Sequence, residues 1–191
     1  MKSKTLSVIS WVLALVVLGF ALVYYNFVDK KKSLEGVAVG DICPDFSVET
    51  VVVTEGDFAM SGEQFNLNEN SGKVRVINFW ATWCSACIHE LPYFDEFAKA
   101  HPEVEVIAIC GSSGPSNIVT KWMNDNKAEW KDFSLTFGFY GPDRDLYTQL
   151  GGTGFWPTTI VVDEAGVIRY TQGVELDVEK LENIVLPLLN D

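Results

Sequence analysis

The chain has 191 residues, 48% of them hydrophobic, and a formal net charge of −12 at pH 7. Residues 34–191 hold 9 of the 14 Lys and Arg but 25 of the 26 Asp and Glu. A surface this acidic repels the phosphate backbone, so nucleic acid is excluded as a partner. The length after residue 33 suits one well-buried domain.

The first 32 residues predict a membrane anchor. Residues 5–28 carry no charge and are rich in Leu, Val, Ile and Ala, and about 20 such residues cross a bilayer. A cleavable signal peptide has a shorter apolar core of roughly 7–15 residues and a small-residue cleavage site, which this segment lacks. Lysines flank the apolar segment on both sides, and the two positive flanks nearly balance. The charge distribution therefore does not predict which end of the anchor faces the cytoplasm. We expect a linker over residues 33–39 and one domain over residues 40–191.

The domain is expected to begin with a β-hairpin. Strand-like runs at residues 46–48 and 51–53 precede Gly56 and Gly62, a pattern typical of hairpins. Residues 74–80 are mostly β-branched and aromatic, which predicts a buried parallel strand. Residues 85–100 then predict a helix.

Two cysteines stand where this strand gives way to the helix. Cys84 would lie at the helix start, where unpaired N–H groups and the helix dipole favour a thiolate. A free thiol titrates near ~8.5, and cysteines in this position fall to roughly 3.5–7.5. Cys87 follows one turn later on the same side and can resolve a mixed disulfide. We predict a redox-active disulfide with Cys84 as nucleophile and Cys87 as resolving thiol.

A zinc site and a pair of inert core thiols are the alternatives for this spacing. Cys43 and Cys110 could complete a four-thiolate cage, although they are lone cysteines rather than a second CxxC pair. In an oxidising compartment they could instead form a structural disulfide or stay as buried thiols. The sequence does not decide between these two. We expect no bound metal.

The rest of the chain alternates strands and helices. Strands are predicted at residues 104–110 and 135–139, and helices at 116–127 and 143–150. The segments 160–163 and 167–172 flank Glu-Ala-Gly, which indicates a hairpin, and residues 178–189 predict a closing helix. This order predicts an α/β domain with a central mixed sheet.

These motifs together resemble thioredoxin-fold proteins of the TlpA/ResA-like group. The resemblance spans about residues 40–189 and rests on Asn-Phe-Trp-Ala-Thr-Trp-Cys-Ser-Ala-Cys at 78–87, Glu-Leu-Pro at 90–92 and Trp-Pro-Thr-Thr at 156–159. It implies a thioredoxin fold, a central mixed sheet flanked by helices, with an N-terminal hairpin and an insertion between about residues 112 and 150.

The resemblance also implies an activity and a location. It implies a membrane-tethered, extracytoplasmic thiol–disulfide oxidoreductase that needs no cofactor and acts on protein cysteines. Such a protein would serve as a reductant, for example in cytochrome c maturation, and a membrane electron donor would recharge it. A peroxidase of the peroxiredoxin kind is one rival, and it would depend on a single cysteine. A copper- or zinc-binding thiol chaperone is another.

Several site residues follow from the same resemblance. Pro157 would be a cis-proline beside the disulfide, with Thr158 next to it in the substrate site, and Pro92 would kink the active-site helix. The backbone of Trp156 could then pair with an extended substrate segment. Trp83 and Trp156 would form an apolar platform, although either could serve ordinary core packing.

Glu90 is the predicted proton carrier. Its position three residues after Cys87 places it on the same side of the helix, beneath the dithiol. Thioredoxins carry a buried carboxylate six residues before the first cysteine, and Asn78 occupies that position here. We expect burial to raise the pKa of Glu90 and to let it exchange a proton with Cys87; a solvated helix glutamate is the alternative. His89 and His101 are expected at the surface.

Overall fold

The computed structural model describes residues 15–21, 24, 37–68, 72–142, 145–152 and 154–189. The chain divides into two units, Met1–Gly36 and Val37–Asp191. In the first unit the described residues are helical, and most of the predicted anchor lies outside them. Among the described residues, no helix combines the length and the apolar character needed to cross a membrane.

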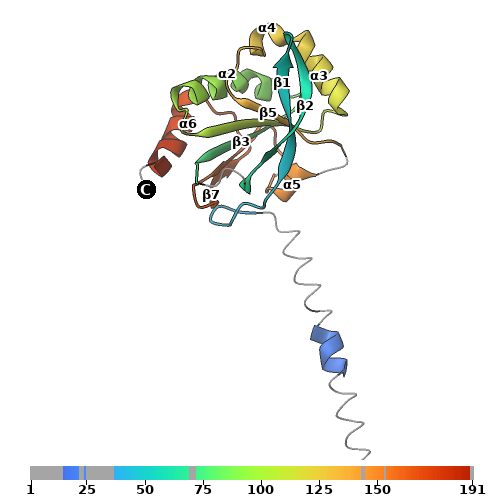
Figure 1. Cartoon of the computed structure of the whole chain (residues 1–191). Coiled ribbons are helices and arrows are strands. Elements are labelled where there is room, and N and C mark those ends of the chain that lie inside the picture. Colours follow the sequence, from blue (N-terminus) through green and yellow to red (C-terminus); the bar gives the residue numbers. More distant parts are fainter. Residues whose placement is uncertain are drawn as a thin grey trace, which may run out of the picture. The chain divides into compact units, whose positions relative to one another are not determined.

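The second unit is built on one mixed sheet of seven strands in the order β2-β1-β5-β4-β3-β6-β7 (Figure 1). The strands are β1 (Ser47–Thr54), β2 (Asp57–Asn66), β3 (Arg75–Trp80), β4 (Glu105–Cys110), β5 (Thr136–Phe139), β6 (Thr158–Val162) and β7 (Ile168–Gln172). Strands β3, β4 and β5 run parallel, whereas the other pairs are antiparallel. The mixed α/β sheet is therefore as predicted.

Helices cover both faces of this sheet. They are α2 (Ser85–Ala100), α3 (Ser116–Asp125), α4 (Lys127–Trp130), α5 (Leu146–Gln149), α6 (Val178–Val185) and the 3₁₀ turn η2 (Leu186–Leu189). Apolar side chains of α2, α3 and α6 belong to the core cluster on one face. Side chains of α5 pack into the cluster on the other face, together with the segment around Phe46. Figure 1 shows α2 and α6 side by side.

The central strand β3 is buried throughout and contributes side chains to both core clusters. Successive side chains of a strand point to opposite faces, so Ile77 and Phe79 join the α5 side while Val76 and Trp80 join the α2 side. Asn78 shares the face of Val76 and Trp80 and is fully buried. A polar side chain is thus directed beneath helix α2.

The hairpin β1–β2 and strand β5 form one extension of the core sheet. The two predicted runs merge into a single strand β1, with a bulge between Glu49 and Val51. Glu55 and Gly56 form its two-residue turn, both with positive φ, which suits the twist of a hairpin. Strand β5, from the predicted insertion, pairs with β4 on one side and β1 on the other. The insertion therefore joins the hairpin to the core.

Helix boundaries differ modestly from those predicted. Helix α3 ends at Asp125 and the separate turn α4 follows it. Helix α5 begins at Leu146, because the Asp145 side chain caps its first turn by accepting from Thr148 N. The closing helix turns into a 3₁₀ turn that contains Pro187, since proline lacks the N–H that would continue the helix.

Candidate active site

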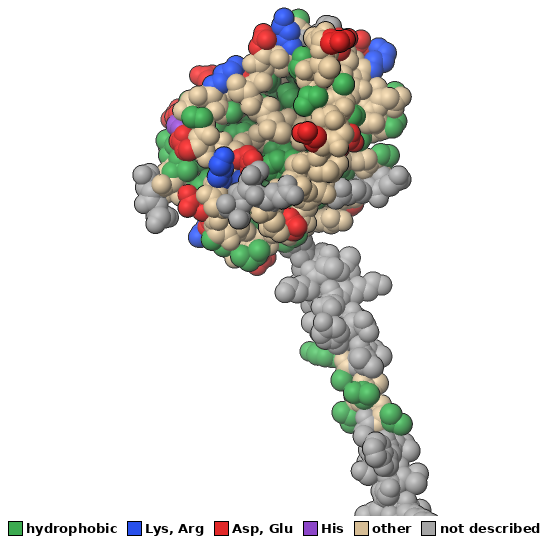
Figure 2. Space-filling model, in the orientation of Figure 1, with side chains coloured by type: hydrophobic (Ala, Val, Ile, Leu, Met, Phe, Trp, Pro, Cys, Tyr) green, Lys and Arg blue, Asp and Glu red, His purple; other side chains and the backbone are tan. Residues whose placement is uncertain are grey.

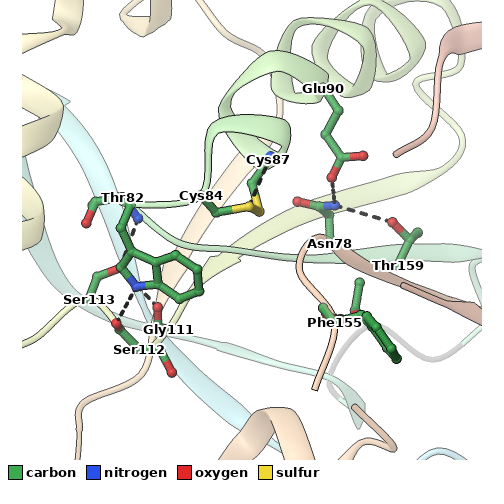
Figure 3. Close-up of a disulfide and its surroundings, with 12 residues drawn as sticks. Asn78, Thr82, Cys84, Cys87, Glu90, Gly111, Ser112, Ser113, Phe155 and Thr159 are labelled. Carbon is green, nitrogen blue, oxygen red and sulfur yellow. Dashed lines mark hydrogen bonds between the residues drawn. A yellow bond between two sulfur atoms is a disulfide. The ribbon is translucent and has the colours of Figure 1, made fainter. Parts of the chain in front are cut away.

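Cys84 and Cys87 are joined by a disulfide at the start of α2, with their Cα atoms 5.3 Å apart (Figure 3). Cys84 is the N-cap residue, and its Sγ accepts from the backbone N–H of Cys87 at 3.2 Å. Cys84 is 6% exposed, whereas Cys87 is fully buried. The sulfur of Cys84 is therefore the more accessible one, and the helix start would stabilise its thiolate.

The loop after β4 fixes the residues that precede Cys84. Because β3 and β4 are parallel, their carboxyl ends meet at one edge of the sheet. Trp83 Nε1 donates to the carbonyl of Ser112 at 2.8 Å, and Thr82 N donates to Ser113 Oγ at 3.0 Å (Figure 3). Trp83 is nevertheless 58% exposed, so its indole is both held in place and open to a partner.

The loop of residues 154–157, just before β6, is called the proline loop here. It contains the predicted cis peptide bond, between Trp156 and Pro157. The Trp156 ring is half-buried and contacts that of Trp83, with centroids 5.7 Å apart. It also packs against both core clusters, so Trp156 contributes to core packing, and its role in an apolar platform stays a prediction. The Thr158 side chain is buried and donates to the carbonyl of Phe155 at 2.6 Å. The Thr158 hydroxyl therefore supports the loop from inside.

Sequence reasoning missed Tyr147, the main support of this loop. Its hydroxyl donates to the Phe155 carbonyl at 2.6 Å and accepts from Gly154 N at 2.9 Å. Its ring stacks on Trp156, with centroids 4.7 Å apart. Nothing in the sequence separated Tyr147 from an ordinary core aromatic of helix α5. Phe155, 66% exposed beside the cis bond, was missed as well.

Glu90 is fully buried and fully hydrogen-bonded. Its Oε1 accepts from Asn78 Nδ2 at 2.7 Å, and its Oε2 accepts from Leu176 N at 3.0 Å. Burial raises the pKa of Glu90 to about 8; the two hydrogen bonds oppose this shift and the charge of Glu175 adds to it. The predicted burial and raised pKa are confirmed, and the alternative of a solvated helix glutamate is wrong.

Asn78 extends this network to the neighbouring strand. Residues 78 and 159 are paired across β3 and β6, so their side chains lie on the same face. Asn78 Nδ2 also donates to Thr159 Oγ1, at 3.3 Å. The position that holds a carboxylate in thioredoxins thus holds an amide that binds Glu90.

Cys43 and Cys110 are both free and buried. Cys110 lies in the core cluster of the α2 face and Cys43 in the cluster of the opposite face. Neither the structural disulfide nor the four-thiolate cage is formed, because the sheet separates the two side chains. Burial raises the pKa of both thiols to about 12. In the described part of the chain no three His, Cys, Asp or Glu side chains gather as metal ligands.

The two histidines lie away from the disulfide. His89 is exposed, and its Nδ1 lies 2.5 Å from Glu175 Oε1. His101 is half-buried against the Phe97 ring, and its Nε2 lies 3.3 Å from Glu182 Oε1. The surface prediction therefore holds for His89 and is only partly right for His101.

Comparison with known proteins gives a consistent set of relatives. The sequence model of the Redoxin family matches residues 38–185. The thiol-disulfide oxidoreductase ResA of Geobacillus thermodenitrificans is 30% identical over 159 residues, which cover 82% of this chain and 79% of that protein. ResA of Bacillus thuringiensis is 35% identical over 153 residues, covering 78% and 76%.

Solved structures share the fold of the second unit. A putative thiol:disulfide interchange protein DsbE from Chlorobium tepidum superposes with a TM-score of 0.64 at 21% identity, covering 81% of this chain and 99% of that one. A secreted thiol-disulfide isomerase from Corynebacterium glutamicum gives 0.62 at 21% identity, covering 78% and 86%. The arrangement of strands and helices around the disulfide is that of the thioredoxin fold.

The substitution Tyr147→Phe tests the support of the proline loop. It removes the hydroxyl that bonds to Phe155 and Gly154, so we expect the free energy of unfolding to fall by about 1 kcal/mol in urea titrations. Tyr93→Phe, at a half-buried tyrosine of α2, is the matched control and should change stability by less than about 0.5 kcal/mol. Equal losses in the two variants would contradict the role given to Tyr147.

The substitution Glu90→Gln tests the buried carboxyl through the pH dependence of stability. The folded protein holds the proton up to about pH 8, whereas the unfolded chain releases it near 4.5. Wild-type stability should therefore fall as pH rises through this window, by up to about 1.4 kcal/mol per pH unit relative to the variant. Parallel pH profiles of the two proteins in chemical unfolding would show that Glu90 titrates normally.

Proposed function

Because this chain belongs to the Redoxin family, as a thioredoxin-fold thiol–disulfide oxidoreductase of the TlpA/ResA-like group, we propose that it exchanges the Cys84–Cys87 pair with cysteines of secreted or membrane-exposed proteins. The observation that carries the proposal is the disulfide at the start of α2, with one sulfur accessible and the other buried. Acting as a reductant, the chain would keep thiols of partner proteins reduced outside the cytoplasm.

The exchange proceeds in two displacements. The Cys84 thiolate attacks a partner disulfide, forms a mixed disulfide and releases one partner sulfur as a thiolate. Cys87 then attacks the Cys84 sulfur and releases the second partner sulfur. Two electrons pass to the partner, and the Cys84–Cys87 disulfide closes.

Glu90 supplies the proton transfer of the second displacement. The Cys87 thiol must lose its proton before it attacks, and Glu90 follows it by one helical turn on the same side of α2. A carboxyl pKa of about 8 lies closer to the pKa of a thiol than the 4.5 of an exposed glutamate does, so the transfer costs less than it would to a solvated carboxylate. Resetting the carboxyl then returns the proton to solvent or to the next thiol.

The partner would bind against the exposed aromatic side chains beside the disulfide. Trp83 and Phe155 are both largely exposed, 58% and 66%, and offer apolar contact to residues that flank a partner cysteine. The backbone of Trp156, next to the cis bond to Pro157, would pair with an extended partner segment beside Thr158. Binding of this kind favours unfolded or strand-like segments.

The first 32 residues would tether the domain to the cell membrane as a single span, with residues 33–39 as the linker. In the first unit the large apolar side chains at 15–18 and 20 are exposed, up to 78% for Phe20. Figure 2 shows hydrophobic side chains on the surface of this helical segment. Such side chains are stabilised in a lipid environment. The domain would lie outside the cytoplasm, where disulfides persist and reductants are needed, for cytochrome c maturation or other secreted thiols. A membrane electron donor would recharge it.

The variant Cys87→Ser tests the mechanism in cells. It cannot resolve the mixed disulfide, so covalent complexes between Cys84 and partner proteins should accumulate, visible as bands that disappear on reduction. If the chain is a reductant, the captured partners should also be more oxidised in cells that lack it. Cys110→Ser, which removes a buried thiol that is not part of the pair, is the matched control and should trap nothing. A lack of complexes, or equal trapping in both variants, would contradict the exchange.

A further inference from the structure

A buried amide beside the disulfide has hydrogen-bonding capacity that the proposed reaction leaves unused. Asn78 is fully buried, and its Nδ2 donates to Glu90 Oε1 at 2.7 Å and to Thr159 Oγ1 at 3.3 Å (Figure 3). Its Oδ1 is equally buried and has no hydrogen-bond partner within the described residues. Buried polar atoms are seldom unpartnered, so this oxygen calls for a physical reason.

The present bonds suit the ionised form of Glu90 better than the protonated form. Both carboxyl oxygens accept, one from Asn78 and one from the backbone N–H of Leu176, which suits a carboxylate. A protonated carboxyl gains an O–H donor and keeps only part of its acceptor capacity. A proton on Oε1 that points at Asn78 would face the N–H of that amide, so two donors would oppose each other. The Leu176 N–H belongs to the backbone and cannot become an acceptor.

A half-turn of the Asn78 amide resolves this conflict. It exchanges the positions of Nδ2 and Oδ1, so that Oδ1 accepts the O–H of protonated Glu90. The Thr159 hydroxyl serves both arrangements, because a hydroxyl accepts from an N–H and donates to a carbonyl. One amide atom stays unpartnered in either arrangement, as Oδ1 is here. The Asn78 oxygen that lacks a partner in this arrangement thus corresponds to an Asn78 N–H that would lack a partner in the rotated arrangement.

We propose that Asn78 is a positioning residue whose amide rotates by half a turn as Glu90 gains or loses its proton. The proton leaves Cys87 Sγ and arrives on Glu90 Oε1, no electrons move in this step, and the rotated amide accepts the new O–H. The inference deepens the proposed function and rests on Glu90 as the proton carrier. The raised pKa of Glu90, about 8, supports it because both states are then populated near neutral pH.

Charged neighbours influence where Glu90 titrates but do not replace the amide. Glu175, in the segment before α6, raises the pKa of Glu90. Tyr170 of β7 interacts with Glu90, and Lys180 of α6 interacts with Tyr170 and Glu175. These charges shift the midpoint of the titration. The hydrogen bond that must change direction is the one to Asn78.

The rotation is directly observable by NMR in the full-length protein with its disulfide closed. We expect cross-peaks from the Asn78 side-chain N–H protons to Thr159 to be strong at pH 9.5 and to weaken at least threefold at pH 6. The change should share its midpoint with the carboxyl carbon shift of Glu90. Unchanged cross-peaks while Glu90 titrates would overturn the proposal, as would a Glu90 that does not titrate in this range. No thiol reacts in this experiment, so its outcome is separate from that of the trapping test.

A kinetic comparison then measures the consequence. In Asn78→Leu neither state of Glu90 has its side-chain partner, so oxidation of the reduced protein by oxidised glutathione should slow about tenfold between pH 6 and 9, with a flattened pH profile. Thr159→Ser keeps both the amide and the hydroxyl and should change the rate less than threefold with the profile retained. Equal effects of the two variants would assign Asn78 a merely structural role. If Asn78→Leu does not fold, the NMR result on the wild-type protein decides.

Discussion

The disulfide lies where a strand buried on both faces gives way to a helix, and this junction constrains every other part of the site. Strand β3 sits between β4 and β6 in the sheet, so its register is fixed by side chains on two packed faces. Its end therefore places Cys84 at the N-cap of α2. The loop after β4 and the proline loop converge on the same edge and hold Trp83 and Trp156 against each other.

Two opposite electrostatic environments meet within the first two turns of helix α2. The start of α2 presents N–H groups and a positive dipole end to Cys84, which favours negative charge. Six residues further along the chain, burial raises the pKa of Glu90 and favours the protonated form. In the proposed exchange, a Cys84 thiolate would be stabilised near the surface while Glu90 holds a proton beneath it. This separation would let Cys84 attack while the Cys87 thiol waits for a base.

The parts of the site that are local in sequence were predictable from it. The CxxC spacing predicted the disulfide, and the helical period placed Glu90 on the buried side, since both depend on neighbours within one turn. The cis bond at Pro157 came from the family resemblance, because an isolated Trp-Pro dipeptide favours trans. Contacts from distant segments were not predictable: Tyr147 beneath the proline loop and the Leu176 N–H on Glu90 depend on how separate elements pack.

The most direct test of the account is the pH dependence of alkylation of the reduced full-length protein, with each cysteine followed by mass spectrometry. Cys84 should react first, with a midpoint clearly below the ~8.5 of a free thiol, and Cys87 should react much more slowly because it is buried beneath the helix start. Faster modification of Cys87, or a midpoint for Cys84 at or above ~8.5, would contradict the assignment of Cys84 as the attacking sulfur.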